Sequence, residues 1–292
     1  MKFWVKFSRS IFKLAVQPRL KKMKPKLLEA VLARSPLIID VEMVNEIRSF
    51  VISQQTTQGG FADRGGKSDL YYSLFGLFVA EAFSVSEVFE PLRKYVAEVV
   101  SKEELSGVYR YCGAILYAKL MGLDANTEKL RIQIVKDLKR GSSNQPEYSS
   151  FLGILSLYYL EDYLTLQRIV NQYNRSFLMK GSHPCPVTAA NEVILSMASG
   201  QSQKGVGKLL SFHRQNGGFA ALHRAPAEDL LSTGVALFAL NFLEADYRLI
   251  KPDCLNFVDD LYDNGGFRST HADSMTDVEY TFYGLLALGS MN

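Results

Sequence analysis

The sequence predicts an all-α protein: an (α/α)6 toroid of six inner and six outer helices, preceded by a basic amphipathic helix. A Gly-Gly-Phe turn, a short polar stretch, an Asp and an apolar helix recur at 58–77, 215–240 and 263–288. Because clear copies occur at both ends of the chain, one unit repeats around one fold, and the last unit is expected to pack against the first. The predicted domains are an N-terminal segment, 1–27, and a single toroid, 28–292.

Six inner helices are expected where a small or hydroxyl residue, two variable residues and a small residue open an apolar run. These openings recur about every 37–48 residues, the length of two helices and their turns. Runs such as LFGLFVAEAF and GVALFALNFL are apolar on most faces, so we expect them to be buried on both sides. The openings are 72–76, 109–113, 149–153, 188–192, 232–236 and 280–284.

The outer helices are expected between these runs. The intervening segments mix charged and apolar residues at helical spacing, which is typical of helices buried on one side; clear examples are 88–105, 130–140 and 166–178. The glycine pairs of the three strong motifs are expected to form tight turns before the inner helices, because glycine adopts a positive φ at little cost. A helical bundle or an open solenoid is the alternative to a closed toroid.

The charge is unevenly placed along the chain. The net charge is +3, but nine of the 33 basic residues precede the first acidic one, Glu29, which leaves 24 basic against 30 acidic residues in the rest. On a helical wheel, Lys2, Lys6 and two further basic residues form one stripe, and Trp4 and Phe7 begin an apolar stripe opposite. We expect residues 2–26 to contact an anionic membrane surface; a helix packed on the toroid is the alternative.

Composition also excludes several classes. Cys112, Cys185 and Cys254 are far apart and have no CxxC spacing, which argues against a disulfide scaffold or a zinc ribbon and favours a reducing, cytoplasmic location. No apolar run is long enough to cross a membrane, and no secretory signal is recognisable, so peripheral membrane association is expected. Nucleic acid is not expected as a partner, because the body of the chain is acidic.

The repeated motif resembles a known superfamily. GGFADRGG, followed by Asp69 and YYSLFGL, is similar to the last repeat of a geranylgeranyl transferase β subunit. The chain from about residue 45 to 290 resembles protein prenyltransferase β subunits and, more distantly, squalene and oxidosqualene cyclases. This resemblance implies an α/α toroid with an isoprenoid in a central cavity.

The zinc ligands of the prenyltransferases are not matched. The resemblance requires an Asp, a Cys two positions later and a His at the start of the next inner helix. Asp229 fits the Asp, but Leu231 stands at the Cys position and Tyr280 at the His position. Thiolate and imidazole are the groups that hold Zn²⁺ in this arrangement. We therefore predict no zinc site and no cofactor, although Mg²⁺ would accompany a diphosphate substrate.

The diphosphate-binding residues of the family are matched in part. Ser182-His183 matches a Ser-His pair of the family in type and order, and Arg224 matches a basic residue before the Asp. A second anion site is expected at Arg64 and Lys67, just before Asp69. Charged donors at helix N-termini are suited to a diphosphate head whose tail lies in an apolar cavity.

The cyclase branch implies a different role for the last repeat. Asp277-Val-Glu279-Tyr280-Thr281 is similar in placement to the DxDDT motif, whose central acid protonates an alkene. Glu279 is then the proton donor, kept protonated by apolar surroundings, with Asp277 and Asp229 as further candidate catalytic acids. Tyr280 replaces the last Asp of the motif.

Each of these residues also has a purely structural interpretation. Asp69, Asp229 and Asp277 stand where a helix N-cap is expected. Aromatic residues such as Tyr72 and Tyr280 gather at the openings of inner helices, where they either pack in the core or line an isoprenoid pocket and stabilise a carbocation.

Two functions fit the sequence. The first is a prenyltransferase-like or terpenoid-cyclase-like protein that binds a prenyl diphosphate or polyprenyl chain in its cavity, without zinc, at the membrane surface. The second is a non-catalytic toroid that binds a protein partner. A glycan-active toroid fits poorly, because the chain has a single tryptophan and its candidate catalytic carboxylates stand at expected capping positions.

Overall fold

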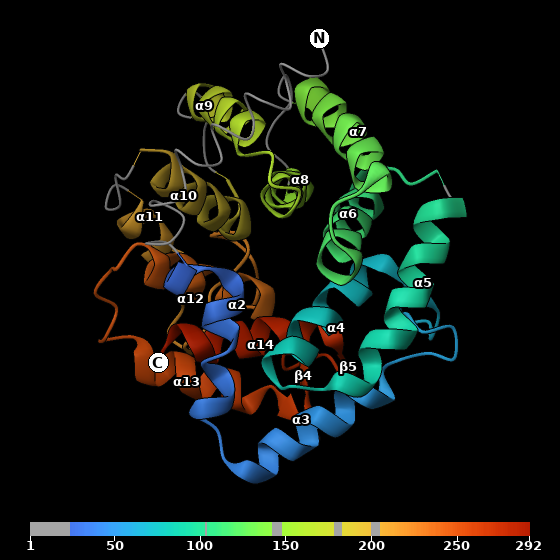
Figure 1. Cartoon of the computed structure of the whole chain (residues 1–292). Helices are drawn as coiled ribbons and strands as arrows, with labels where there is room; N and C mark the ends of the chain where they lie inside the picture. The colour runs from blue at the N-terminus through green and yellow to red at the C-terminus, as the bar shows by residue number, and fades with distance from the viewer. Residues whose placement is uncertain (1–23, 103, 142–147, 178–182, 200–204) are drawn as a thin grey trace. The chain divides into compact units, whose positions relative to one another are not determined.

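The computed structural model describes residues 24–102, 104–141, 148–177, 183–199 and 205–292 (Figure 1). Contacts divide the chain into two compact units. Unit 1 comprises residues 1–25 and 96–181, and unit 2 comprises residues 26–95 and 182–292. Most of the predicted membrane-binding segment, 2–26, lies outside the described residues; its described end, Lys24–Lys26, is a 3-10 turn (η1).

Thirteen α-helices alternate with turns in the part of the chain that the structure describes. In unit 2 they are α2 (Leu28–Leu32), α3 (Val41–Ser53), α4 (Leu70–Ala82), α10 (Cys185–Ser199), α11 (Val206–Leu210), α12 (Leu230–Phe242), α13 (Lys251–Asp260) and α14 (Val278–Ser290). The helix α5 (Phe89–Lys102) begins in unit 2 and ends in unit 1. Unit 1 holds α6 (Gly107–Met121), α7 (Ala125–Gly141), α8 (Tyr148–Tyr159) and α9 (Tyr163–Phe177), and two more 3-10 turns, η2 (Ser35–Leu37) and η3 (Ser86–Val88), lie in unit 2.

An apolar helix occupies each of the six predicted openings. These helices are α4, α6, α8, α10, α12 and α14. In the three strong repeats the motif Asp is the N-cap: Asp69, Asp229 and Asp277 each accept a hydrogen bond from a backbone N–H in the first turn of their helix. A carboxylate there satisfies donors that lack a partner within the helix, so the same residue type starts each of these helices.

The motif also forms short strand pairs that the sequence did not predict. The motif Phe pairs with the motif Asp in each copy: Phe61 with Asp69 between β1 (Phe61–Ala62) and β2 (Ser68–Asp69), and Phe219 with Asp229 as an isolated bridge. In the last copy, β3 (Tyr262–Asp263), β4 (Gly266–Arg268) and β5 (Thr276–Asp277) form a three-stranded sheet. Strands of two or three residues are too short to show an alternating pattern, so only the repeat marks their place.

The motif Phe ties each turn to its apolar helix. All three of these Phe side chains are fully buried. The N–H of Phe61 donates to Ser73 Oγ at 2.9 Å, and that of Phe219 donates to Thr233 Oγ1 at 2.9 Å. The last copy repeats the bond between Phe267 N–H and Thr281 Oγ1, at 3.1 Å. Each hydroxyl stands four residues after the motif Asp, so the three copies share one architecture.

The first glycine of each motif is confirmed as a turn that needs glycine. Gly59, Gly217 and Gly265 have φ of +93°, +92° and +88°. A Cβ at Gly265 would lie 2.4 Å from the carbonyl oxygen of Glu46 on α3. The turn of the last repeat therefore packs against the first long helix of unit 2, which connects the two ends of the described chain within this unit.

Helix α14 is central to the packing of unit 2, between α12 and α4 (Figure 1). Helix α10 packs on α12, and α2 lies against α14, where Gly289 allows the backbone of Val31 to approach. Aromatic rings fill the contact between α4 and α14: Phe75 lies 4.9 Å from Phe282 and 5.6 Å from Tyr283, measured between ring centroids. This packing fixes the first turns of α4 and α14 relative to each other.

Unit 1 is a smaller helical assembly. Helix α6 packs on α7 and α8, and α8 packs on α9. Two arginines hold the one-sided helix α7 in place: the buried Arg110 pairs with Asp137, and the half-buried Arg131 donates to Asp162 Oδ2 at 2.7 Å. Asp162 is 1% exposed, so loss of Arg131 would leave this buried carboxyl group without its arginine partner.

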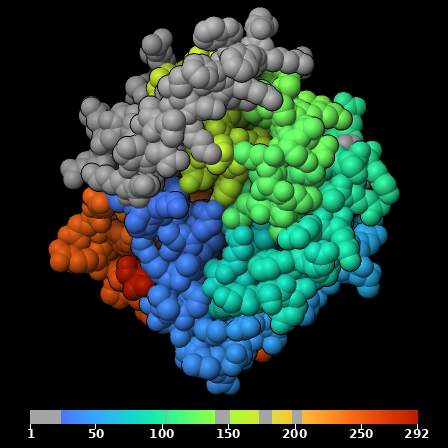
Figure 2. All heavy atoms as spheres, viewed as in Figure 1, coloured from blue at the N-terminus to red at the C-terminus, as the bar shows by residue number. Residues whose placement is uncertain are grey.

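Part of the exposed apolar surface of unit 2 lies beside α3. Helices α2 and α3 (blue) lie on the face drawn in Figure 2. Leu37 and Val41, just before and at the start of α3, are 77% and 76% exposed. An open groove of about 850 Å³ is lined by Val41, Phe50 and polar residues of α3. None of the described helices is long and apolar enough to cross a membrane.

Candidate functional site

The starts of the apolar helices form one edge of unit 2, because each is bonded to the loop that precedes a neighbouring helix. The N–H of Cys185 (α10) donates to Ala221 O at 2.8 Å, and the N–H of Leu230 (α12) donates to Ser269 O at 2.9 Å. At the start of α14 a side chain makes the link: Arg64 reaches across from the turn between β1 and β2. The candidate site is this edge.

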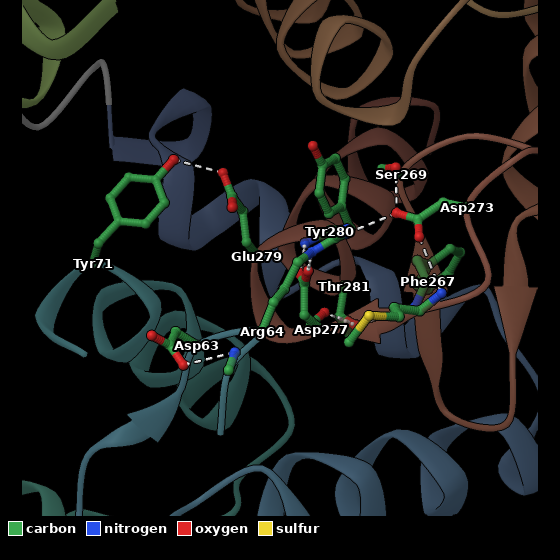
Figure 3. Close-up of polar contacts among 12 residues, drawn as sticks. Asp63, Arg64, Tyr71, Phe267, Ser269, Asp273, Asp277, Glu279, Tyr280 and Thr281 are labelled. Atoms are coloured by element: carbon green, nitrogen blue, oxygen red, sulfur yellow. Dashed lines mark hydrogen bonds and ion pairs between the residues drawn. The ribbon is translucent and has the colours of Figure 1, made fainter. Parts of the chain in front are cut away.

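Arg64 binds two carboxylates of the last repeat (Figure 3). Its Nε donates to Asp277 Oδ2 at 2.7 Å, and its Nη2 donates to Asp273 Oδ2 at 2.8 Å. The guanidinium carbon also lies 5.2 Å from the ring centroid of Tyr280. Ser269 Oγ donates to Asp273 at 2.5 Å, which holds that carboxylate in place. The charge of Arg64 is therefore compensated within the protein.

Glu279 lies two residues after Asp277, in the first turn of α14, and contacts a different partner. The hydroxyl of Tyr71, on α4, donates to Glu279 Oε1 at 2.5 Å (Figure 3). Glu279 is 7% exposed and Asp277 is 3% exposed, so both carboxyl groups are buried. The first turn of α14 thus presents two buried acids, one held by an arginine and the other by a tyrosine.

The environment of Glu279 favours its protonated form. Burial raises the pKa of Glu279 to about 7, and the nearby charge of Asp277 also raises it, whereas the bond from Tyr71 and the charge of Arg64 lower it. Burial also raises the pKa of Asp277, against the opposing effect of hydrogen bonds from the N–H of Tyr280 and from Arg64. Glu279 is accordingly a buried acid that changes its charge near neutral pH.

Phenol groups surround this pair. Burial and the neighbouring carboxylates raise the pKa of Tyr72 and of Tyr280 to about 12. Both phenols stay neutral at physiological pH and act as hydrogen-bond donors and as π faces. Tyr71, Tyr72 and Phe75 are in edge-to-face contact along the first turns of α4.

Asp229 lies at the start of α12, within electrostatic range of Tyr280. Both of its oxygens accept bonds from Ser232: the N–H at 2.7 Å and Oγ at 2.8 Å. Burial raises the pKa of Asp229, whereas these bonds lower it. Cys185 is fully buried nearby, and burial raises the pKa of its thiol, so it is not a thiolate at neutral pH.

Asp69 and Lys67 flank the start of α4. Asp69 Oδ1 accepts the N–H groups of Tyr71 and Tyr72 at 2.7 Å and 3.0 Å, so this carboxylate caps the helix. The backbone N–H of Lys67 donates to Asp63 Oδ1 at 2.9 Å, and its side chain is exposed. The turn that carries Arg64 is therefore fixed by Asp63.

The structure does not show contacts between the remaining candidates and the acid pair. His183 is 5% exposed and precedes α10, where Thr188 Oγ1 donates to its carbonyl oxygen at 3.4 Å. Arg224 is exposed in the loop before α12 and has no ion pair with the described residues. Ser182 lies outside the described residues.

Two residues of the site were not among the predicted site residues. Tyr71 and Asp273 provide the partners of Glu279 and Arg64, respectively. The repeat contains a signal for Tyr71: it stands two residues after Asp69, as Glu279 stands two residues after Asp277 and Leu231 two after Asp229. Aligning the copies places these three side chains at one level of neighbouring helices. No such signal marks Asp273, whose counterpart in the shorter first loop is undefined.

The positions of the family's zinc ligands are occupied by Asp229, Leu231 and Tyr280. Leu231 has no donor atom, both oxygens of Asp229 accept bonds from Ser232, and the phenol of Tyr280 has a raised pKa. Within the described ranges, no group of three or more His, Cys, Asp or Glu side chains is arranged to hold a metal ion.

Comparison with known proteins identifies the family. No curated protein and no solved structure matches the chain. The model of the prenyltransferase alpha-alpha toroid domain matches residues 3–124 and 185–291, which is most of the sequence. These ranges include the three strong repeats and the whole acid-bearing edge of unit 2. The chain belongs to the prenyltransferase alpha-alpha toroid domain family.

Proposed function

We propose that this protein binds an isoprenoid chain and that Glu279 acts on it as a general acid. The observation that carries the proposal is a buried carboxyl group with a pKa of about 7 at the start of an apolar helix, beside an ionised arginine–aspartate pair. Two acids whose environments differ in this way are the usual signature of an acid site.

The chemistry we propose is protonation of an alkene. The Glu279 O–H bond breaks, its proton forms a C–H bond with one alkene carbon, and the other carbon becomes a carbocation while Glu279 becomes a carboxylate. The carboxylate of Asp277 and the rings of Tyr72 and Tyr280 stabilise positive charge at this point. Loss of a proton from the carbocation, or capture of water, completes the reaction, and Glu279 is reprotonated from solvent.

The ion pairs of Arg64 favour an uncharged polyprenyl chain at this end of the site. Arg64 already binds Asp277 and Asp273, so it is not the main ligand of a diphosphate. For a substrate with a diphosphate head, Arg224, Lys67 and His183 are the candidate ligands, with Mg²⁺ as counter-ion. Peripheral membrane contact through residues 2–26, on the cytoplasmic side, would supply such a substrate from the bilayer.

Binding and turnover test this proposal with a matched pair of variants. Glu279→Gln removes the acid and keeps its size, whereas Glu228→Gln changes a buried carboxylate that is bonded to Asn216 away from the acid pair. Thermal-shift titrations use a polyprenol, farnesyl diphosphate and geranylgeranyl diphosphate, each with and without Zn²⁺ and Mg²⁺. We expect an isoprenoid to stabilise wild type, Glu279→Gln and Glu228→Gln alike, and product to be lost only in Glu279→Gln. Absence of any isoprenoid-dependent shift would contradict the proposal.

A second function, binding of a protein partner by a non-catalytic toroid, is favoured by the exposed Leu37 and Val41 beside the open groove on α3. This candidate predicts a stoichiometric partner in native mass spectrometry of the purified protein. Val41→Asp should release that partner, while Glu279→Gln should have no effect on it. A monomer that turns over an isoprenoid would exclude this function as the main one.

A further inference from the structure

Equivalent positions of two repeats face each other across the contact between α4 and α14. Tyr71 and Glu279 each stand two residues after the motif Asp, and their side chains meet in a hydrogen bond of 2.5 Å. At this level α12 presents Leu231, which has no polar atom. Among the three strong repeats, an acid and a hydrogen-bond donor therefore occur together only at this pair of helices.

Tyr71 is held in place by packing against neighbouring aromatic rings. Its ring is 4.8 Å from that of Phe75, which in turn packs on Phe282 of α14. The backbone N–H of Tyr71 is fixed by the cap Asp69. Its hydroxyl is consequently directed at Glu279 by packing on both helices (Figure 3).

The two buried acids accept different sets of hydrogen bonds. Asp277 accepts through both oxygens: Oδ1 from the N–H of Tyr280 at 2.8 Å and Oδ2 from Arg64 at 2.7 Å. Glu279 accepts through Oε1 alone, from Tyr71, and its Oε2 has no hydrogen bond with the described residues. A carboxyl group that accepts through both oxygens is stabilised as the anion, whereas one with a free oxygen has a place for a proton.

We propose that Tyr71 is a positioning residue that assigns the acidic proton of Glu279 to Oε2, by donating its own hydroxyl hydrogen to Oε1. A neutral carboxyl group accepts hydrogen bonds best through its carbonyl oxygen, so the donor at Oε1 makes Oε2 the hydroxyl oxygen. Arg64 has the corresponding effect on Asp277: by donating to Oδ2 it favours the carboxylate form of Asp277, which accepts hydrogen bonds and donates none. The part of this inference that gives Tyr71 a role in proton transfer to a substrate rests on the proposed function of Glu279.

The charged and titratable groups around Glu279 come from four segments. Asp277 and Tyr280 lie on its own turn, Arg64 on the β1–β2 turn, Asp69, Tyr71 and Tyr72 at the start of α4, and Asp229 at the start of α12. Of these, only Tyr71 donates a side-chain hydrogen bond to Glu279. Removing that donor leaves the charges unchanged, so its effect on Glu279 is separable from theirs.

Infrared titration of the full chain tests the assignment without any substrate. The carbonyl band of protonated Glu279 is identified by its absence from Glu279→Gln, and its amplitude is followed against pH. In Tyr71→Phe the carboxylate of Glu279 loses a hydrogen bond, so the midpoint of the Glu279 titration should rise by about 1 to 2 pH units. The carbonyl band of protonated Glu279 should also move to higher frequency, because its carbonyl oxygen no longer accepts that bond. Tyr247→Phe is the control, since it removes a phenol hydrogen bond of 2.5 Å to Ser290 O at the other end of α14.

A midpoint that is unchanged in Tyr71→Phe, or that moves equally in Tyr247→Phe, would overturn the inference. The wild-type band gives a second reading that does not require Tyr71→Phe to fold: a frequency typical of a hydrogen-bonded carbonyl supports the assignment, and that of a free carbonyl contradicts it. Turnover is measured separately. If the infrared shifts occur while wild-type protein converts no isoprenoid, the position of the proton stands and the proposed function fails.

Discussion

At the scale of single residues, the first turn of α14 contains two acids with opposite roles. Asp277 caps its helix and pairs with Arg64, so its negative charge serves to stabilise the fold. Glu279 forms no ion pair with the described residues and is buried beside the charge of Asp277, and both burial and that charge raise its pKa. The capping interpretation and the chemical interpretation of this motif therefore apply to different residues, two positions apart.

The first residue-scale prediction concerns stability against pH. The pKa of Glu279 is about 7 in the folded protein, whereas an ordinary glutamate, as in the unfolded chain, has a pKa of 4.5. The folded state therefore binds the proton of Glu279 more tightly than the unfolded state does. Its contribution to stability is present below pH 4.5 and is lost as pH rises through 7, by on the order of 3 kcal/mol. Urea unfolding across this range should show Glu279→Gln gaining stability relative to wild type as the pH rises. If the free energies of unfolding of wild type and Glu279→Gln changed with pH in parallel, this prediction would be refuted.

The second residue-scale prediction concerns Arg64. In Arg64→Met the buried Asp277 loses its cation, and the free energy of unfolding should fall by about 2–3 kcal/mol, less than for a fully buried pair because Arg64 is partly exposed. Lys67→Met, in the same turn, removes an exposed charge and should change the free energy by less than about 0.5 kcal/mol. Equal effects of the two variants in chemical denaturation would mean that the Arg64 ion pairs do not stabilise the fold.

At the scale of elements, the sequence was sufficient to place the apolar helices but not the contacts at their starts. Helices α4, α12 and α14 were predicted because an Asp precedes a long apolar run in each case. The pairing of the motif Phe with the motif Asp was not predicted, since strands of two or three residues leave no periodic pattern. The packing of α14 on α4 follows the expectation that the last unit packs against the first. The sequence did not indicate which side chains meet there, so the bond between Tyr71 and Glu279 was not predicted.

The element-scale prediction concerns the turn before the last repeat. Gly265→Ala places a Cβ against the backbone of Glu46 at a positive φ, so we expect the free energy of unfolding to fall by more than about 2 kcal/mol. Gly66→Ala is the matched control: Gly66 has φ +81° but open space around it, so only the backbone strain, about 1 kcal/mol, is added. A similar loss of stability in both variants would show that contact with α3 is not what constrains the turn.

At the scale of the whole molecule, the family match confirms the α/α toroid class that the repeats predict. The two matched segments lie on either side of residues 125–184, where the repeat was weakest in the sequence. Glycine pairs and motif Asp residues are missing there, and helices α7, α8 and α9 are recognisable only by their apolar pattern. The strong repeats and the candidate site therefore coincide in unit 2.

The whole-molecule prediction concerns membrane contact by the basic N-terminal segment. Deletion of residues 2–23 removes seven basic residues but keeps Lys26, which pairs with Glu244. We expect the wild-type chain to float with vesicles that contain anionic lipid at low salt, and the deletion variant to remain in solution. Thermal unfolding should be similar for both proteins. Flotation of the deletion variant to the same extent would contradict the predicted role of the segment.

The fate of the proton from Glu279 shows whether this residue is the general acid. Purified protein is incubated with a polyprenyl substrate in D₂O, where Glu279 exchanges its proton for deuterium, and the extracted product is analysed by mass spectrometry. We expect wild type and Glu228→Gln to give a product that contains one deuterium on carbon, and Glu279→Gln to give no such product. A product without deuterium, or undiminished deuterium incorporation by Glu279→Gln, would contradict it.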